Sequence, residues 1–238
     1  MTGEHSSSQY NHDLEAIRSQ VLTMGGLVET HFQDAMACYR SGNETQSAAV
    51  VKSDEEVNRL EVMLDDMCSH LIVKRQPAAN DLRTVMATGK VITDLERIGD
   101  ESTKIARIAQ SMLSKNRNNP MFSGYETVRV LANNVEQMLH QSLDAFARLD
   151  DAKAVQLIAF DETIDNDFRS IMRNLITFMM EDPSTISNAL DALWVAKAIE
   201  RIGDHAKNIA EHTIYIVEGR DIRHSDYVLN ELKNINQD

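Results

Sequence analysis

Apolar residues in this chain recur every three or four positions over long stretches. Three such series run along the sequence: Val57, Leu60, Leu64, Met67 and Leu71; Ile164, Phe168, Ile171, Leu175 and Phe178; and Ile202, Ala206, Ile209, Thr213 and Ile216. Steps of three and four place these side chains on one stripe of an α-helix, as in helices that pack nearly parallel to each other. With only 9 glycines and 3 prolines in 238 residues, the pattern predicts an all-α protein.

Residues that break helices are few and widely spaced. They fall at Ser41-Gly42-Asn43, Pro77, residues 116–124 with Pro120, Asp150-Asp151 and Pro183. Because these breaks leave stretches of about 25–35 residues, which is long for helices of globular proteins, we expect six long helices. Short connections between them favour antiparallel neighbours.

One segment of the chain is repeated. Residues 95–100, Leu-Glu-Arg-Ile-Gly-Asp, recur as Ile-Glu-Arg-Ile-Gly-Asp at 199–204, 104 positions later. Pro77 and Pro183 lie 106 positions apart, and the acidic segment at 54–58 aligns with the one at 161–165. These similar offsets predict two tandem, pseudo-symmetric three-helix bundles, residues 1–119 and residues 120–238. We expect residues 1–12 to be flexible and residues 219–238 to form a C-terminal tail.

The repeated motif places two carboxylates one helical turn apart. Glu96 and Asp100 in the first copy, and Glu200 and Asp204 in the second, are i, i+4 pairs on one helix face. Like charges at this spacing destabilise a helix by about 0.2–0.5 kcal/mol. An unfavourable pair at two equivalent positions predicts a compensating cation. A helical projection turns both acids of the second copy away from the apolar series, toward solvent or a neighbouring surface.

Further acids precede each copy of the motif. Asp161 and Asp165 form a third i, i+4 pair, whereas the equivalent positions of the first repeat hold Asp54 and Asn58. Antiparallel neighbouring helices would bring these acids beside the repeated motif, where their oxygens suit hard cations such as Mg²⁺, Ca²⁺, Mn²⁺ or ferric iron. The alternative is that the acids only solvate an exposed helix face.

Glycines inside the predicted helices indicate close packing. Gly99 and Gly203 stand within the repeated motif, where a glycine costs about 1 kcal/mol relative to alanine. We therefore expect close helix approach or access to the backbone at these positions. Gly25 and Gly26 interrupt the first helix and indicate a kink or a close contact with another helix.

Composition and charge narrow the possible partners and location. The chain has 37 acidic and 24 basic residues, a formal net charge of −13 and a pI near 5.0. Nucleic acid is not an expected partner, because phosphate binding needs clustered Lys and Arg. No apolar stretch approaches the ~20 residues that span a bilayer, and no signal-peptide pattern is recognised. We expect a cytoplasmic protein without membrane insertion, in which Cys38 and Cys68 are buried thiols.

Known catalytic motifs are not recognised. The chain has no Glu-x-x-His pair, no glycine-rich phosphate loop and no His-Glu-x-x-His motif, which are signatures of di-iron, nucleotide-binding and zinc enzymes. His205 and His212 are expected at the surface or rim, and Trp194 in core or interface packing.

Several segments together strongly resemble the PhoU family of bacterial regulators of phosphate uptake. They are the doubled Glu-Arg-Ile-Gly-Asp at 96–100 and 200–204, Ile-Arg-Ser-Gln-Val-Leu-Thr-Met-Gly-Gly at 17–26, Lys-Arg-Gln-Pro at 74–77 and Met-Met-Glu-Asp at 179–182. The resemblance runs from about Ile17 to about His224. It implies a cytoplasmic, non-enzymatic protein of two three-helix bundles, commonly a homodimer, that represses the phosphate-starvation response when phosphate is plentiful.

The resemblance also implies partners and metal ligands. It implies an adaptor between the phosphate ABC transporter, through its ATPase subunit, and the membrane sensor histidine kinase of a two-component system. The family's Glu/Asp-x-x-x-Asp motifs bind metal clusters, which implies iron, manganese, magnesium, zinc or nickel as the cofactor. Carried over by motif, the metal ligands are Glu96, Asp100, Asp161, Asp165, Glu200, Asp204 and, as a weaker match because of Asn58, Asp54.

Two further expectations concern these acids. The first repeat has 13 bases and 17 acids and the second has 11 and 20, so we expect the stronger metal site in the second. A metal-dependent phosphoester hydrolase, in which clustered carboxylates hold ions that activate water, is the alternative function. Against it, no general base is recognised near the motifs, and Arg97 and Arg201 are expected to turn away from the acidic face.

Overall fold

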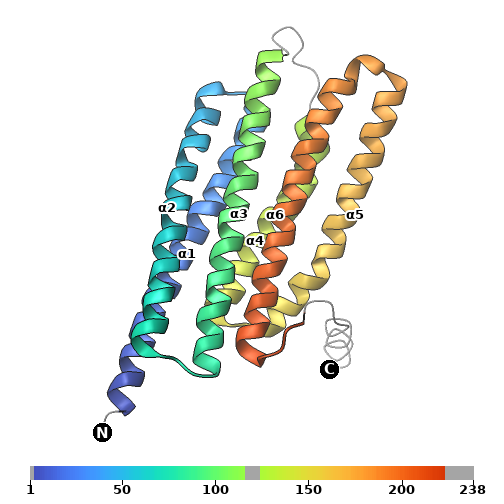
Figure 1. Ribbon diagram of the computed structural model, residues 1–238. Coiled ribbons are helices and arrows are strands. Elements are labelled where there is room, and N and C mark those ends of the chain that lie inside the picture. The colour runs from blue at the N-terminus through green and yellow to red at the C-terminus, as the bar shows by residue number, and fades with distance from the viewer. Residues whose placement is uncertain (1–2, 116–123, 223–238) are drawn as a thin grey trace, which may run out of the picture.

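Long helices make up most of the molecule (Figure 1). The computed structural model describes residues 3–115 and 124–222, and in these ranges it contains helices and turns but no strand. The helices are α1 (Gly3–Ser41), α2 (Glu44–Arg75), α3 (Asn80–Lys115), α4 (Gly124–Arg148), α5 (Asp151–Glu181) and α6 (Ile186–Glu218), with a 3₁₀ turn at Pro183–Thr185. The predicted all-α fold of two three-helix repeats is confirmed. The expected boundary at 119/120 and residues 223–238 of the expected tail lie outside the described residues.

The helices begin and end where the sequence supplies a cap or a turn. Gly42 follows α1 with a φ of 66°, a backbone conformation that favours glycine. Asn43 is the N-cap of α2, because its side chain accepts hydrogen bonds from the backbone N–H groups two and three residues further on. Asp150 caps α5 by accepting from the N–H three residues on. Replacing such a cap by alanine typically costs ~1 kcal/mol.

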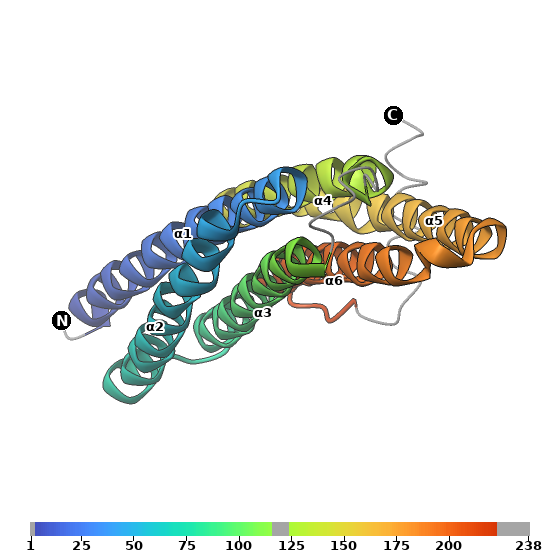
Figure 2. The same cartoon turned by 90° about the horizontal axis from the view of Figure 1, so that it is seen from above.

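The two repeats join through their third helices. Figure 2 shows α1, α2 and α3 at one end of an elongated molecule and α4, α5 and α6 at the other. In the middle, α3 packs against α6, and α1 packs against α4. Figure 1 shows α3 and α6 running in opposite directions. Each half of their contact is therefore made by the C-terminal part of one helix and the N-terminal part of the other.

The predicted apolar series form much of the core. The series in α2 and α6 are buried or nearly so, as are Ile164, Ile171 and Leu175 of α5. Phe178 does not follow the prediction, because it is 45 % exposed in the last turns of α5, where the chain leaves for α6. Cys38 and Cys68 are buried free thiols, as expected.

Two glycines lie at close contacts between helices, as expected from the sequence. A Cβ at Gly25 of α1 would lie 2.8 Å from Leu143 Cδ2 of α4. A Cβ at Gly99 of α3 would lie 3.1 Å from Val57 Cγ1 of α2. Both contacts are shorter than carbon–carbon van der Waals separations of about 3.5–4.0 Å. Glycine therefore lets α1 meet α4, and α2 meet α3, at short range.

The described helices include none that is both long enough and apolar enough to span a bilayer.

Candidate metal site

Acids of α2 and α3 come together in the first repeat. Burial raises the pKa of Glu96, and the negative charges of Asp100, Glu61 and Asp54 raise it further, against a smaller opposing effect of Arg97. Burial also raises the pKa of Glu61 itself. Sequence reasoning missed Glu61, although it forms an i, i+4 acidic pair with Asp65 on α2. We call Asp54, Glu61, Glu96 and Asp100 the first acidic cluster.

One oxygen of this cluster is unsatisfied. Asp54 Oδ1 is buried and has no hydrogen-bond partner among the residues that the structure describes. It lies 3.4 Å from the position that a Cβ on Gly99 would occupy, so the glycine leaves space beside it. A buried acceptor without a partner costs about 1–3 kcal/mol. A cation bound beside this oxygen would relieve that cost.

Acids of α5 and α6 come together in the second repeat. Asp161 and Glu200 are buried. Although Asp204 stays open to solvent on one side, burial and the nearby charges of Glu200 and Asp161 raise its pKa to about 6. Asp165 instead pairs with Arg169 of its own helix, at 3.1 Å. We call Asp161, Glu200 and Asp204 the second acidic cluster.

Lysines already balance part of the second cluster. Lys207 Nζ donates to Asp161 Oδ2 at 2.5 Å, and Lys197 Nζ donates to Glu200 Oε2 at 2.5 Å. At the offset of 104, the first repeat has Thr103 and Thr93 at the equivalent positions. The second cluster therefore carries two ammonium groups that the first lacks.

In both clusters the carboxylates affect each other's ionisation without converging on one point. Within the part of the chain that the structure describes, no three or more His, Cys, Asp or Glu side chains are grouped so as to hold a metal ion. Metal binding would require the carboxylates to turn toward one another, which exposed or half-buried acids do at low cost. The residues that fit a hard cation are thus present, but their side chains do not form a closed set of ligands.

Of the two arginines in the repeated motif, Arg97 contradicts the sequence-based expectation, whereas Arg201 turns away from the acids of its own motif, as expected. Arg97 Nε lies 3.4 Å from Glu96 Oε2, so it does not turn away from the acidic face. Arg201 reaches across to the other repeat, with Nη1 3.1 Å from Glu101 Oε1 on α3. Glu101 is buried between the two helices. The second arginine therefore contributes to the contact between the repeats.

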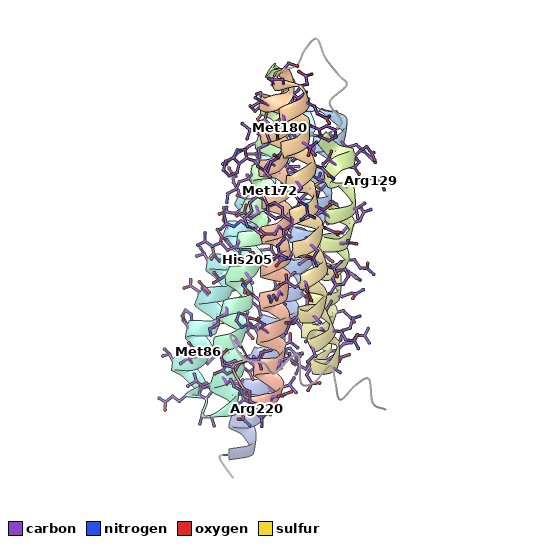
Figure 3. All side chains as sticks on the ribbon, turned by 90° about the vertical axis from the view of Figure 1, so that its right-hand side faces the viewer. Met86, Arg129, Met172, Met180, His205 and Arg220 are labelled. Atoms are coloured by element: carbon purple, nitrogen blue, oxygen red, sulfur yellow. The ribbon has the colours of Figure 1, made fainter. Side chains whose placement is uncertain are left out.

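A second polar contact between α3 and α6 was also missed from the sequence. Asp94 of α3 is buried, and its Oδ1 accepts hydrogen bonds from His205 Nδ1 at 2.8 Å and Asn208 Nδ2 at 3.0 Å. His212 Nε2 lies 3.3 Å from Asp94 Oδ2. His212 is buried rather than at the surface; His205, labelled in Figure 3, lies midway along α6. Both histidines follow acidic residues in the sequence, and nothing local to them indicates a partner 111 or more positions away.

The fold and its acids define a class of protein: a duplicated three-helix unit with carboxylates between the second and third helices of each copy. The family model described as "PhoU domain" matches residues 21–109 and 128–213. These two matches cover most of α1–α3 and of α4–α6. The chain belongs to the PhoU family.

Individual relatives match over nearly the whole chain. A phosphate-specific transport system accessory protein PhoU homolog of Pseudomonas putida is 43% identical over 220 residues, which are 92% of this chain and 85% of that protein. The accessory protein PhoU of Escherichia coli is 44% identical over 93% of this chain and 90% of its own length. The crystal structure of PhoU from Pseudomonas aeruginosa has a TM-score of 0.83 at 41% identity, covering 89% of this chain and all of that one.

Proposed function

We propose that this protein is a cytoplasmic regulatory adaptor of phosphate uptake. In this proposal it represses the phosphate-starvation response when phosphate is plentiful, by linking the phosphate ABC transporter, through its ATPase subunit, to the sensor histidine kinase. The observation that carries the proposal is the 41–44% identity, over about nine tenths of this chain, to proteins named phosphate-specific transport system accessory proteins. Long helices with extended exposed faces suit binding of other proteins.

The adaptor role is tested in the source bacterium by deleting the gene. We expect a phosphate-starvation reporter to become active in phosphate-rich medium and to be silenced again by a plasmid copy of the wild-type gene. Purified protein should bind the isolated ATPase subunit and the cytoplasmic part of the kinase. A reporter that stays fully repressed in the deletion strain would refute the regulatory role.

Metal binding by the acids is a second part of the proposal. All seven predicted ligands offer carboxylate oxygens, which suit divalent or ferric ions. The first acidic cluster is the better candidate for two reasons. Asp54 Oδ1 has no hydrogen-bond partner among the described residues. Burial raises the pKa of Glu96, and the charges of Asp100, Glu61 and Asp54 raise it further than the nearby Arg97 lowers it. The lysines of the second cluster compete with a cation for Asp161 and Glu200. These lysine contacts favour the first repeat as the stronger metal site, whereas the acid count alone predicts the second.

A matched set of variants tests the metal proposal. Elemental analysis and Mn²⁺ titration would compare Glu96→Gln/Asp100→Asn with Glu200→Gln/Asp204→Asn. We expect the first pair to lose more affinity, since Arg97 approaches Glu96 only to 3.4 Å, whereas Lys197 already donates to Glu200 at 2.5 Å. Unchanged metal content in an Asp100→Ala/Asp204→Ala protein would show that these acids do not hold the metal.

The alternative hydrolase function is tested with the same proteins. Saturable turnover of a generic phosphoester with added Mn²⁺, lost in Glu200→Ala, would assign catalysis to the second cluster. We expect no such activity. Light scattering of the purified protein tests the proposed homodimer, for which we expect twice the chain mass of 26.8 kDa.

A further inference from the structure

A basic cavity lies where the repeats meet, although the protein as a whole is acidic. The C-terminal half of α3 and the N-terminal half of α6 run side by side there (Figure 1). The cavity between them measures about 420 Å³. Four basic side chains line it: Lys104, Arg107, Lys197 and Arg201. Much of the remaining lining is apolar and includes Trp194, the single tryptophan of the chain.

Positive charge remains at this cavity after its internal ion pairs are considered. Buried Glu101 is shared by Lys104, at 2.8 Å, and Arg201, at 3.1 Å. Lys197 pairs with Glu200 at 2.5 Å. Glu101 and Glu200 therefore pair with three of the four cations, and Asp204 also lies near Lys197. Arg107 is exposed and forms no ion pair within the residues that the structure describes. Because the chain carries −13 overall, an anionic partner is repelled by most of its surface and attracted here.

An apolar stripe leads along α6 to the cavity. Ile186, Leu190 and Trp194 follow at i, i+4 and i+8, so they lie on one helix face, and all three are exposed. Trp194 is 63 % exposed, so of the two expected roles, core or interface packing, the core is excluded. Exposed apolar side chains on a shared patch mark interaction sites. Trp and Arg are the side chains most enriched among those that dominate binding energy.

The equivalent surface of the first repeat lacks the tryptophan. At the offset of 104, Leu82 and Met86 of α3 correspond to Ile186 and Leu190 and are also exposed. Lys90 stands in place of Trp194 and lies 5.8 Å from the ring of Tyr215, so it is drawn into a contact within the protein. The aromatic side chain next to a basic cavity is therefore a property of the second repeat.

We propose that this surface docks an acidic segment of the transporter's ATPase subunit. An apolar side chain of the segment enters the cavity beside Trp194, and its carboxylates pair with Arg107 and Lys104. The stripe from Ile186 to Trp194 extends about 12 Å along α6, at 1.5 Å per residue, which fits an extended peptide segment better than a small anion. This inference rests on the proposed adaptor function and assigns it a surface and a partner chemistry.

The test measures the affinity of the full-length protein for the purified ATPase subunit. Trp194→Ala and Arg107→Glu alter exposed side chains and should leave helicity unchanged. Matched controls come from α4: Val130→Ala, an apolar side chain that is 55 % exposed, and Arg129→Glu, an exposed arginine labelled in Figure 3. We expect at least tenfold weaker binding for each cavity variant and less than twofold change for each control. The effect of Arg107→Glu should shrink as salt is raised, because the attraction is electrostatic.

Other results would overturn the inference. If wild type binds the ATPase subunit and both cavity variants bind it equally well, the surface assignment is wrong while the adaptor function stands. If wild type does not bind, the inference fails together with the transporter link. Light scattering that shows a dimer becoming a monomer in Trp194→Ala would assign the surface to a second copy of this chain. Saturable quenching of Trp194 fluorescence by ATP, lost in Arg107→Glu, would assign the cavity to a small anion.

Discussion

Asp94 links the two repeats, and its replacement by alanine is expected to destabilise the protein strongly. The side chain is 7 % exposed, and its two carboxylate oxygens contact His205, Asn208 and His212 of α6. Asp94→Ala removes the acceptor and leaves three polar side chains without their partner at a helix interface. A buried polar group that loses its partner costs more than the bond itself contributed.

The size of the effect follows from the two shorter contacts. A hydrogen bond to a charged group contributes about 1.5–3 kcal/mol, and Asp94 Oδ1 accepts two, at 2.8 and 3.0 Å. The contact with His212, at 3.3 Å, adds less. Since the His205 side chain is not fully buried, water can replace part of what is lost. We therefore expect a decrease of about 3–4 kcal/mol in the free energy of unfolding, and a smaller decrease for Asp94→Asn, which keeps one acceptor.

The same contacts predict a pH dependence. Burial alone would raise the pKa of Asp94, but hydrogen bonds from His205, His212 and Asn208 outweigh it, and the pKa is lowered. A carboxyl group whose pKa is lower in the folded state stabilises the fold above its unfolded-state pKa, near 3.9, and loses that effect as the pH falls through its folded-state pKa. The difference between wild type and Asp94→Ala should thus be full at pH 7 and shrink below about pH 4.

Urea unfolding at pH 7 measures this prediction, with Trp194 fluorescence reporting on the second repeat and far-UV circular dichroism on all helices. Coincident transitions are needed before a free energy is calculated. A double-mutant cycle with His205→Ala should give a coupling energy above 1 kcal/mol, because the two side chains are in direct contact. A loss below 1 kcal/mol for Asp94→Ala would refute the reasoning, since the contact would then contribute little.

Three further predictions concern single sites. Gly25→Val should lower the free energy of unfolding by about 1–3 kcal/mol by overpacking against Leu143, whereas Gly26→Ala, with nothing within 4 Å of its Cβ, should raise it by up to about 1 kcal/mol; equal melting temperatures would contradict this. Because the pKa of Asp204 is raised to about 6, the folded state binds a proton that the unfolded state has released, and its stability falls as the pH rises from about 4 to 6. Asp204→Asn should therefore raise the melting temperature more at pH 7.5 than at pH 4.5, and an equal effect at both would count against the shift. Burial raises the pKa of Cys68 to about 11, so iodoacetamide at pH 8 should label neither buried cysteine until urea unfolds the protein; rapid labelling of the native protein would contradict their burial.

The helices and their core could be predicted from the sequence because they depend on local spacing. Ile202 and Ile209 are seven residues apart, so they share a helix face whatever packs against it, and both are fully buried. Phe178 continues the spacing of its series yet is exposed, because the period of a helix does not show where the neighbouring helices stop covering it. The repeat likewise predicted two copies of one unit, but not how the copies meet. The contacts of Asp94 with His205 and of Glu101 with Arg201 depend on how the two repeats pack together.

For the acidic clusters too, the sequence predicts the backbone positions of the acids but not the charges that surround them. A duplicated sequence predicts equivalent backbone positions, and Glu96 and Glu200 do lie in corresponding places beside acids of the preceding helix. Their surroundings differ, because ammonium groups contact the second cluster at 2.5 Å whereas threonines hold the equivalent positions in the first. The net charge of a repeat includes every acid and lysine regardless of position. The attraction of a bound cation, in contrast, depends mainly on the charges within a few ångströms of it. The stronger metal site expected in the second repeat therefore stays a prediction from net charge, whereas the side chains themselves leave more unbalanced negative charge in the first acidic cluster.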